Sequence, residues 1–335
     1  MNFDISSKLL EKMWDTIVDK GISALLRPWQ MKRENKARLE CLREEKLETI
    51  KINNEAKKLQ ISLDKEQFID AELVPQIEQI ASETLNTKIH EIVKEEMSVA
   101  KAIEYAGEYI EEKQMRDEKP AEKPTDEWLN KWKKRTQEFS DEDALRLWGK
   151  VLAGEFASPG SFSYKFLDWM GGITPSDAQL ISKLMENVFM DYYFRGDEKD
   201  ENMPLTYGEL LLLQELEVVQ GVESLGMRVT MDSNIRESFE KVLLSANNKK
   251  VIFIEHSDVS KKAVLNNICT LTRIGREVKK LCDVDVNPVM IQKIADHFIK
   301  LGYDVFCADI LSMGLGSFNF SNKIKIKQNG TVNLA

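Results

Sequence analysis

Side chains that could take part in acid–base or nucleophilic chemistry stand close together in residues 140–184. Asp143 and Glu155 lie twelve residues apart, which is more than three turns of a shared helix and too far for two carboxylates that share a proton. Ser161 and Ser163 lack the GxSxG pattern and the nearby histidine that a nucleophilic serine needs. We therefore expect Asp143 in the first turn of a helix, Glu155 bound to backbone amides of the SPGSFS turn, and the serines as helix caps.

Residues that could bind a metal ion or a nucleotide form no known motif. The cysteines share no CxxC spacing, and no histidine has a partner within motif distance. These residues are Cys41, Cys269, Cys282, Cys307, His90, His256 and His297. No GxxxxGK(S/T) or GxGxxG stretch precedes a predicted helix, and residues 313–317 lack the third glycine. We predict reduced, mostly buried thiols and no catalytic residues, metal site, cofactor or small-molecule substrate, so the chain is not expected to be an enzyme.

Composition and charge are those of a folded globular protein. Of 335 residues, 42% are hydrophobic and 31% are charged. No apolar run reaches about 18 residues and the N-terminus has no signal-peptide pattern, so we expect a cytoplasmic protein. The net charge is −9, and residues 61–143 carry 12 basic against 22 acidic side chains. Because an acidic centre repels phosphate, nucleic-acid contact would need a local basic patch.

The first 116 residues predict a helical arm. Residues 5–27 are amphipathic, and their apolar stripe is a candidate partner-binding surface: Ile5, Leu9, Met13, Trp14 and Ile17. Residues 29–54 have a narrow apolar seam flanked by Arg and Glu, which favours a coiled coil with a second copy. Four acids in the first helix make membrane contact the less favoured alternative. Residues 63–116 continue the helical periodicity, interrupted at Pro75, with Leu85, Ile89, Ile92, Val99, Ile103 and Ala106 on one face.

Helix caps and prolines divide the centre of the chain. Residues 117–125 contain two prolines and no apolar pattern, which predicts a linker. Residues 126–196 predict a three-helix bundle with tight turns. Ser140 is the expected N-cap of the helix that carries Trp148, and Thr174-Pro175 is expected to start another helix.

The last 130 or so residues change to mixed periodicity. Residues 204–285 predict a winged-helix-like unit, with helices after Thr206 and Thr272. Its strands are expected at 227–231, 251–255 and 268–271, with the last two pairing. Residues 288–335 predict a small α/β tail, with a helix from Pro288 and strands at 303–308 and 323–327.

Basic residues of the 204–285 unit form the candidate nucleic-acid-binding surface. We expect four lysines on the wing and the other cations on the last helix, sharing one face toward phosphate. The candidates are Lys249, Lys250, Lys261, Lys262, Arg273, Arg276 and Lys279. Basic hairpins are also common on solvated surfaces, and the same fold often serves protein contacts alone. Both alternatives stay open at this point.

Residues 140–184 resemble the central block of a bacterial family described only as a domain of unknown function; their sequence is SDEDALRLWGKVLAGEFASPGSFSYKFLDWMGGITPSDAQLISKL. The upstream RPWQMKRENKARLE and the downstream LTRIGREV follow the family's order, so the resemblance covers most of residues 25–285. Where the family often has glutamine, two positions before the Leu-Trp pair, this chain has Leu145. The same helix is similar to abortive-infection alpha proteins of bacteria, which would imply phage defence.

These patterns predict a mainly α protein with an N-terminal helical arm, a central helical bundle, a winged-helix-like α+β unit and a small α/β C-terminal tail. We expect a non-enzymatic bacterial interaction or regulatory protein, with a role in antiviral defence, that binds a partner protein or self-associates as a homo-oligomer through its N-terminal helices. The alternatives are a nucleic-acid-binding winged-helix regulator and a membrane-surface effector.

Overall fold

The computed structural model describes residues 44, 74–112, 124–196, 202–223, 226–314 and 317–330. Within the long helix α3 (Val74–Glu112), the side chains described are those of residues 84, 87, 88 and 90–110. The chain divides into two compact units, Met1–Gly171 and Gly172–Ala335, each with its own core. The predicted N-terminal interface lies outside the described residues, and so do the candidates Ile5, Leu9, Met13, Trp14 and Ile17.

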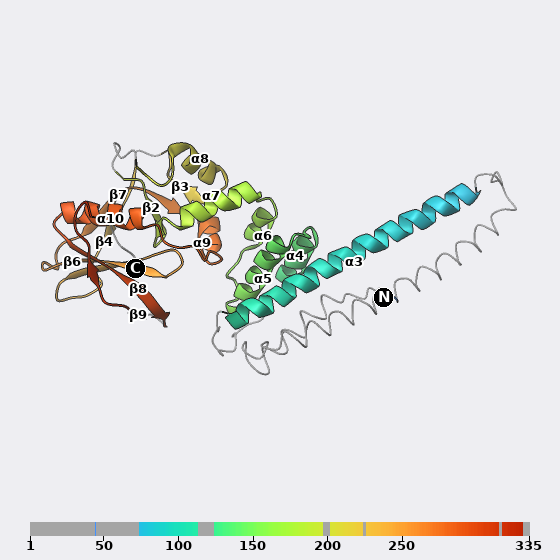
Figure 1. The fold of residues 1–335 in the computed structure, drawn as a ribbon, viewed down its shortest axis with the longest axis horizontal. Coiled ribbons are helices and arrows are strands. Elements are labelled where there is room, and N and C mark those ends of the chain that lie inside the picture. The colour runs from blue at the N-terminus through green and yellow to red at the C-terminus, as the bar shows by residue number, and fades with distance from the viewer. Residues whose placement is uncertain are drawn as a thin grey trace. The chain divides into compact units, whose positions relative to one another are not determined.

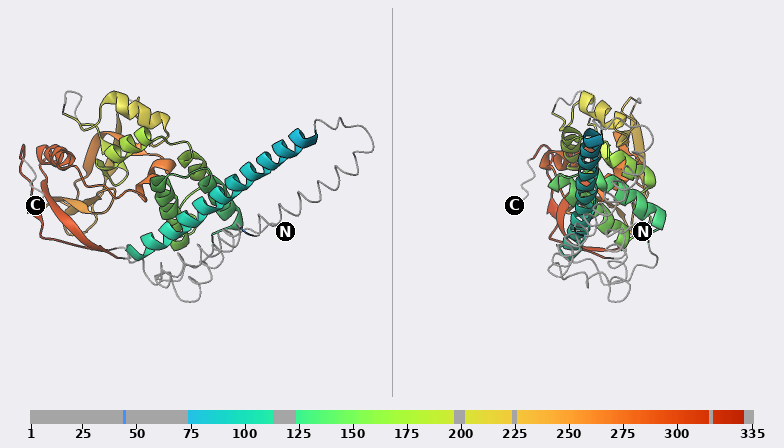
Figure 2. Two further views of the ribbon diagram at one scale, coloured as in Figure 1. Left: turned by 45° about the vertical axis from the view of Figure 1, so that its right-hand side comes forward. Right: turned by 90° about the vertical axis from the view of Figure 1, so that its right-hand side faces the viewer.

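The described part of the first unit is a group of helices around α3. Helix α3 packs against α4 (Asp126–Gln137) and α5 (Glu142–Ala157), and α6 (Tyr164–Met170) packs against α4 (Figure 1). Buried side chains recur every three or four residues of α3, which places them on one helical face. They are Val99, Ile103, Ala106 and Ile110. Figure 2 shows the shorter helices gathered beside the C-terminal half of α3.

Tryptophans fill the core of this unit. Trp132 and Trp148 are almost completely buried, and the indole N–H of Trp132 donates to the carbonyl of Trp148 at 3.0 Å. The indole N–H of Trp128 donates to the carbonyl of Phe162 at 2.8 Å. Since a buried indole N–H without an acceptor would be costly, these two bonds fix how α4 meets α5 and the turn that follows it.

Side-chain caps start the helices of the first unit. Thr125 caps α4, and the predicted Ser163 caps α6. Helix α5 begins one residue later than predicted, because the carboxylate of Asp141, and not the Ser140 hydroxyl, accepts from the amide of Ala144. A carboxylate there also interacts favourably with the helix dipole.

The helices of the second unit begin as their sequences predict. Helices α7 (Pro175–Met185) and α8 (Tyr207–Glu215) each start with a complete capping box, from Thr174 and Thr206 respectively. Thr272 caps α9 (Arg273–Lys279), and Asn287 caps α10 (Pro288–Lys300), where Pro288 occupies the first helical position. Local polar signals therefore determine these four boundaries.

The second unit contains two antiparallel sheets. In the first, sheet A, the long strand β7 (Ala263–Leu271) pairs with β2 (Tyr192–Phe194), β3 (Val219–Gln220) and β4 (Met227–Met231), and β1 (Val188–Phe189) pairs with β2. In the second, sheet B, the strand order is β10 (Ile324–Lys325), β8 (Asp304–Met313), β6 (Lys250–His256), β5 (Phe239–Leu244). Strand β9 (Phe318–Phe320) also pairs with β8.

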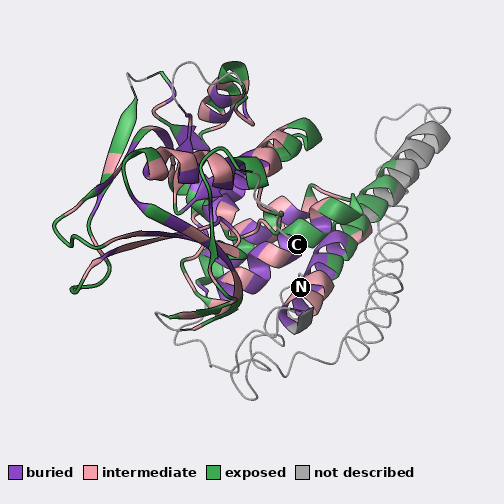
Figure 3. Ribbon diagram, turned by 60° about the vertical axis from the view of Figure 1, so that its left-hand side comes forward, coloured by how far each residue is buried: buried purple, intermediate pink, exposed green. Residues whose placement is uncertain are grey.

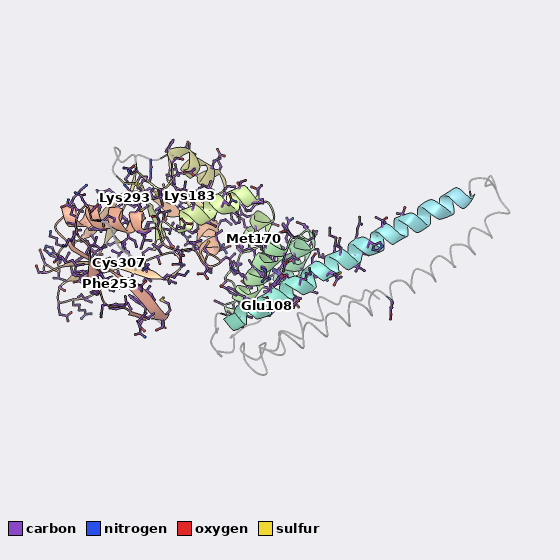
Figure 4. The ribbon with its side chains drawn as sticks, in the orientation of Figure 1. Glu108, Met170, Lys183, Phe253, Lys293 and Cys307 are labelled. Atoms are coloured by element: carbon purple, nitrogen blue, oxygen red, sulfur yellow. The ribbon has the colours of Figure 1, made fainter. Side chains whose placement is uncertain are left out.

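The two faces of sheet B differ in burial. Alternation along the strands places Phe239, Ile252 and Val305 on one face, where all three are completely buried. Helix α10 covers this face, because Phe298 of α10 and Phe239 both contact the ring of Tyr303. The other face carries Val251, Phe253 and Ala308, packed against half-buried side chains from β5, β8 and β9. Figure 4 labels Phe253 on β6 and Cys307 on β8, two side chains of this sheet.

The prediction of a mainly α protein was wrong, because the second unit contains two antiparallel sheets and the fold is α+β. Residues 251–255 do form a strand, but β6 pairs with β5 and β8, whereas residues 268–271 belong to β7 in the other sheet. The predicted wing hairpin is therefore not formed. The predicted tail is not separate either, since its strand β8 is central in sheet B. Alternation marks a strand but does not specify its partner.

At Gly275, helix α9 lies very close to a neighbouring segment of the second unit. A Cβ atom at this position would lie 2.1 Å from the carbonyl oxygen of Val218 and 3.2 Å from the side chain of Leu271. Glycine therefore allows α9 to lie against the chain just before β3.

We predict that Gly275→Ala destabilises the protein by about 1–3 kcal/mol, because the added methyl group collides with backbone that has no room to move. Gly208→Ala is the matched control: Gly208 lies in α8, where a Cβ meets no atom within 4 Å, and alanine there should be neutral or stabilising by up to about 1 kcal/mol. Urea unfolding of both variants measures the difference. Equal midpoints would show that α9 does not need this glycine.

Candidate functional site

Glu155 is the buried carboxylate of the central block, with a residue exposure of 3%. Its Oε1 accepts from the amide of Gly160 at 2.6 Å, and its Oε2 accepts from the amide of Phe162 at 2.9 Å. The interpretation that Glu155 binds the SPGSFS turn is confirmed. Such charge-assisted bonds hold the turn against the end of α5, so both oxygens have a structural role.

The other chemistry-bearing residues of the block are not assembled into a catalytic group. Asp143 lies exposed in the first turn of α5, while Glu155 lies in its last turns. Ser163 accepts from the amide of Phe166 as the cap of α6. Gly160 has a φ of +84°, a conformation that glycine adopts without strain. The segment is therefore a tight turn between α5 and α6 that the Glu155 carboxylate holds in place.

Helices α3 and α5 cross with almost no space between them. A Cβ atom at Gly149 would lie 2.7 Å from the carbonyl oxygen of Ala102, 2.8 Å from Cβ of Tyr105 and 2.9 Å from the amide nitrogen of Ala106. All three distances are shorter than real Cβ contacts. The backbones of the two helices therefore touch at this point, and glycine on α5 facing alanines on α3 makes the contact possible.

A polar group borders this crossing. The hydroxyl of Tyr105 donates to Glu142 at 2.5 Å, and the guanidinium of Arg146 lies 4.2 Å from the centre of the Tyr105 ring. Burial, together with the hydrogen bond to Glu142, raises the pKa of Tyr105 to about 12. The phenol thus remains protonated at neutral pH and keeps its role as a hydrogen-bond donor between α3 and α5.

The lysines of the candidate nucleic-acid surface each have a partner within the chain. Lys249 lies 3.0 Å from Asp283 and 3.2 Å from Asp285, and Lys250 lies 2.5 Å from Asp309. Lys262 lies 3.5 Å from Asp232, and Lys279 pairs with Asp191. The ammonium group of Lys261 lies 5.3 Å from the centre of the Tyr303 ring. Phosphate would have to compete with these carboxylates and with the ring.

The two arginines are engaged as well, and they lie at the opposite end of β7 from Lys261 and Lys262. Arg273 pairs with the largely buried Glu277 at 3.0 Å, and Arg276 donates to the carbonyl of Leu271 at 2.9 Å. Lys261 and Lys262 precede β7, whereas both arginines follow it. The nine residues of β7 separate the two groups by about 30 Å at 3.4 Å per residue. The expected single basic patch is therefore not assembled.

Histidine and cysteine positions in the described ranges offer no metal site. No group of three or more His, Cys, Asp or Glu side chains there is arranged to hold an ion. Burial raises the pKa of both Cys269 and Cys307 to about 11, and no disulfide joins the described cysteines Cys269, Cys282 and Cys307. A search of the same residues finds no helix with the length and apolar character needed to cross a bilayer.

A cluster around Lys323 is the most elaborate polar site that we find on the second unit. The ammonium group of Lys323 lies 2.6 Å from Glu255 and 3.1 Å from Glu240, on neighbouring strands of sheet B. It also lies 3.9 Å from the centre of the Phe253 ring and 5.9 Å from that of Phe320. We call the four residues around Lys323, namely Glu240, Phe253, Glu255 and Phe320, the ammonium cage.

The ammonium cage was not predicted from the sequence. The alternation KIKIK over residues 323–327 predicted a strand, and the side chains of a strand alternate between its faces. That pattern was a usable signal that Lys323, Lys325 and Lys327 share a face. Apart from Phe320, which lies three residues before Lys323, the acids and rings that Lys323 and Lys325 meet come from β5, β6 and β8, so their identity needed the sheet register.

Comparison with known families bears on the central block. Residues 89–203 match the family model described as Protein of unknown function (DUF2806). The expected resemblance of residues 140–184 to a family of unknown function is thereby confirmed, although the match is narrower than residues 25–285. No curated protein and no solved structure gave a significant match to the chain. Gly149, Glu155 and the buried tryptophans all lie inside the matched region.

We predict that Glu155→Gln lowers the free energy of unfolding by about 1–3 kcal/mol, because the new amide NH₂ group faces a backbone N–H and leaves it without an acceptor. Asp143→Asn is the matched control on the same helix: this carboxylate is exposed, so its loss should change stability by no more than about 0.5 kcal/mol. Thermal melting followed by circular dichroism compares the two variants. If they melt together, Glu155 does not hold the turn.

Proposed function

We propose that this chain is a non-enzymatic interaction protein that self-associates through its N-terminal helices, with α3 forming part of the interface. The observation that carries the proposal is the apolar stripe of α3, which continues beyond the helices that cover it. The engagement of Glu155, Ser163 and Asp141 in turns and caps supports a binding role over catalysis for the matched block.

The lengths of the helices explain the uncovered part of the stripe. At 1.5 Å per residue, the 39 residues of α3 extend about 58 Å, whereas the 16 residues of α5 extend about 24 Å. Burial along α3 follows this difference: residues 98–100, 102, 103, 106 and 110 are buried, and most described side chains before Glu96 are exposed (Figure 3). Among the described helices of the first unit, the partners of α3 thus cover only its C-terminal turns.

Ile92 extends the buried stripe into the uncovered turns. At about 100° per residue, Ile92 falls on the same helical face as Glu96, Val99 and Ile103. Its side chain is nevertheless 40% exposed. The sequence continues this spacing at Leu85, whose side chain lies outside the described part. An apolar stripe on a long solvated helix is the geometry that a second helix covers in a coiled coil or bundle.

The nucleic-acid alternative gains less support than self-association. Its seven candidate cations are engaged within the chain, and Lys261 and Lys262 lie at the opposite end of β7 from Arg273 and Arg276. Phosphate binding needs basic side chains gathered on one surface. Burial of the exposed Ile92 side chain, in contrast, requires only an apolar face on a second helix.

We predict that Ile92→Asp lowers the mass measured by multi-angle light scattering to the monomer value of 38.5 kDa, because a charge on the stripe cannot be buried in a helical interface without large cost. Deletion of residues 1–30 should also lower the mass. Leu212→Asp is the matched control, since Leu212 is an exposed apolar residue on α8, and its mass should equal that of the wild type. A wild-type chain that is already monomeric would refute self-association.

A further inference from the structure

The C-terminal strand β10 is attached to sheet B by very few backbone contacts. Only Ile324 and Lys325 pair with β8, opposite Cys307 and Phe306. Beyond this ladder, the amide of Ile326 donates to the carbonyl of Val305 at 2.9 Å, and the amide of Ser321 donates to the carbonyl of Asp309 at 2.8 Å. A strand with so short a ladder depends on its side chains to stay in place.

Those side chains are lysines that enter complementary sites. Lys323 fills the ammonium cage, where two carboxylates accept hydrogen bonds from its ammonium group. The centre of the Phe253 ring lies 3.9 Å from the same group. Two residues later, Lys325 lies 2.6 Å from Asp304 and 5.8 Å from the centre of the Phe306 ring. Each lysine therefore lies near at least one aromatic ring and at least one carboxylate. Cation–π and charge-assisted hydrogen bonds act on the same ammonium group in both places.

The rings of the cage form a preassembled surface. Phe253 lies 4.9 Å from Phe320 and 6.4 Å from Phe318, and Phe318 lies 5.7 Å from Phe320. Phe253 is almost completely buried, whereas Phe320 at the rim is exposed. The deep ring and the outer ring thus form a wall that does not depend on β10 for its position.

We propose that the ammonium cage and the adjoining edge of β8 are a docking site for an extended, lysine-bearing segment of a partner protein, and that residues 323–327 are an internal pseudo-ligand that covers it. The bound segment would add a strand to the edge of sheet B. Two of its lysines, two residues apart, would occupy the places of Lys323 in the ammonium cage and of Lys325 beside Asp304 and Phe306. The inference rests on the proposed function only in taking the chain to be an interaction protein, since it uses the second unit and not α3.

The covering strand is suited to displacement. The side chains of Lys325 and Asp304 are each 60% exposed, so water and salt weaken their attraction. Lys323 is held more firmly, because the side chains of Glu240 and Glu255 are only 24% and 32% exposed. Hydrogen bonds of Ser321 and Ile326 to β8 fix the backbone on either side. The Lys325 contact is therefore the part of the strand that a competing segment displaces first.

Phe320 is an exposed apolar side chain at the rim of the ammonium cage. Ile324 is 64% exposed but lies on the opposite face of the strand from Lys323 and Lys325, because the side chains of a strand alternate between its faces.

The geometry also defines which ammonium group fits. Both carboxylates accept hydrogen bonds from Lys323, so the occupant must carry at least two N–H donors directed at Glu240 and Glu255. A trimethylated lysine has none and would leave both carboxylates without a partner. The site therefore selects unmodified lysine over trimethyl-lysine, the opposite of a cage built from aromatic rings alone.

The test uses the full chain with the site vacated by Lys323→Ala and Lys325→Ala, and a fluorescein-labelled peptide of residues 321–329 as the probe. Fluorescence anisotropy should show that the vacated variant binds the peptide at least tenfold more tightly than the wild type, whose own strand competes. Glu255→Gln in the vacated variant, or trimethyl-lysine at peptide position 323, should reduce binding at least tenfold. The control is a peptide of the same composition with its lysines shifted by one position. It should bind the vacated variant as weakly as the trimethyl-lysine peptide does.

Three results would overturn the proposal. The first is no peptide binding by a vacated variant that retains the wild-type circular dichroism spectrum; if that variant does not fold, the single Lys325→Ala variant replaces it. The second is equal binding of the shifted peptide. The third is a doubled wild-type mass that Lys323→Ala and Lys325→Ala abolish, because the occupant would then be a second copy. Repeating the titration with Ile92→Asp separates this site from self-association through α3, since that substitution should leave peptide binding unchanged.

Discussion

The crossing of α3 and α5 at Gly149 is the contact on which the first unit depends. Two helices normally pack 8–10 Å apart because their side chains separate them. Here glycine faces Ala102 and Ala106, and the backbone atoms themselves limit the approach. This close contact brings Trp148 beneath α4, where its carbonyl receives the indole N–H of Trp132. A wider crossing would open a gap in the packed core and lengthen that bond.

The same constraint explains why the matched block contains the residues it does. Gly149 permits the crossing, and Gly154 leaves room for the ring of Phe162, which would lie 2.8 Å from a Cβ there. Glu155 then holds the turn that carries Phe162, whose carbonyl accepts from Trp128. Glu155 and Ser163, which looked available for chemistry, thus hold a turn and cap a helix. We propose that recognition takes place instead at the apolar stripe of α3 and at the edge of sheet B.

Local features of this fold could be predicted from the sequence, and its long-range pairings could not. The capping boxes at Thr174 and Thr206 and the role of Glu155 follow from spacing within about ten residues. The partners of β6 and β7 depend on which strands meet across the fold, and helix–strand–strand–helix order suits both a winged helix and the observed pair of sheets. For the same reason Lys323 could be placed on a strand but not in a cage, because Glu240, Phe253 and Glu255 reach it only through the register of sheet B.

The most direct test compares two glycine-to-alanine substitutions at the α3–α5 contact. The account predicts that Gly149→Ala lowers the melting temperature by several degrees, corresponding to about 1–3 kcal/mol, because the methyl group forces the helices apart. Gly107→Ala on α3, where a Cβ meets no atom within 4 Å, should leave the melting temperature unchanged or raise it through helix propensity. A Gly149→Ala protein that melts at the wild-type temperature would contradict the claim that backbone contact at this point organises the unit.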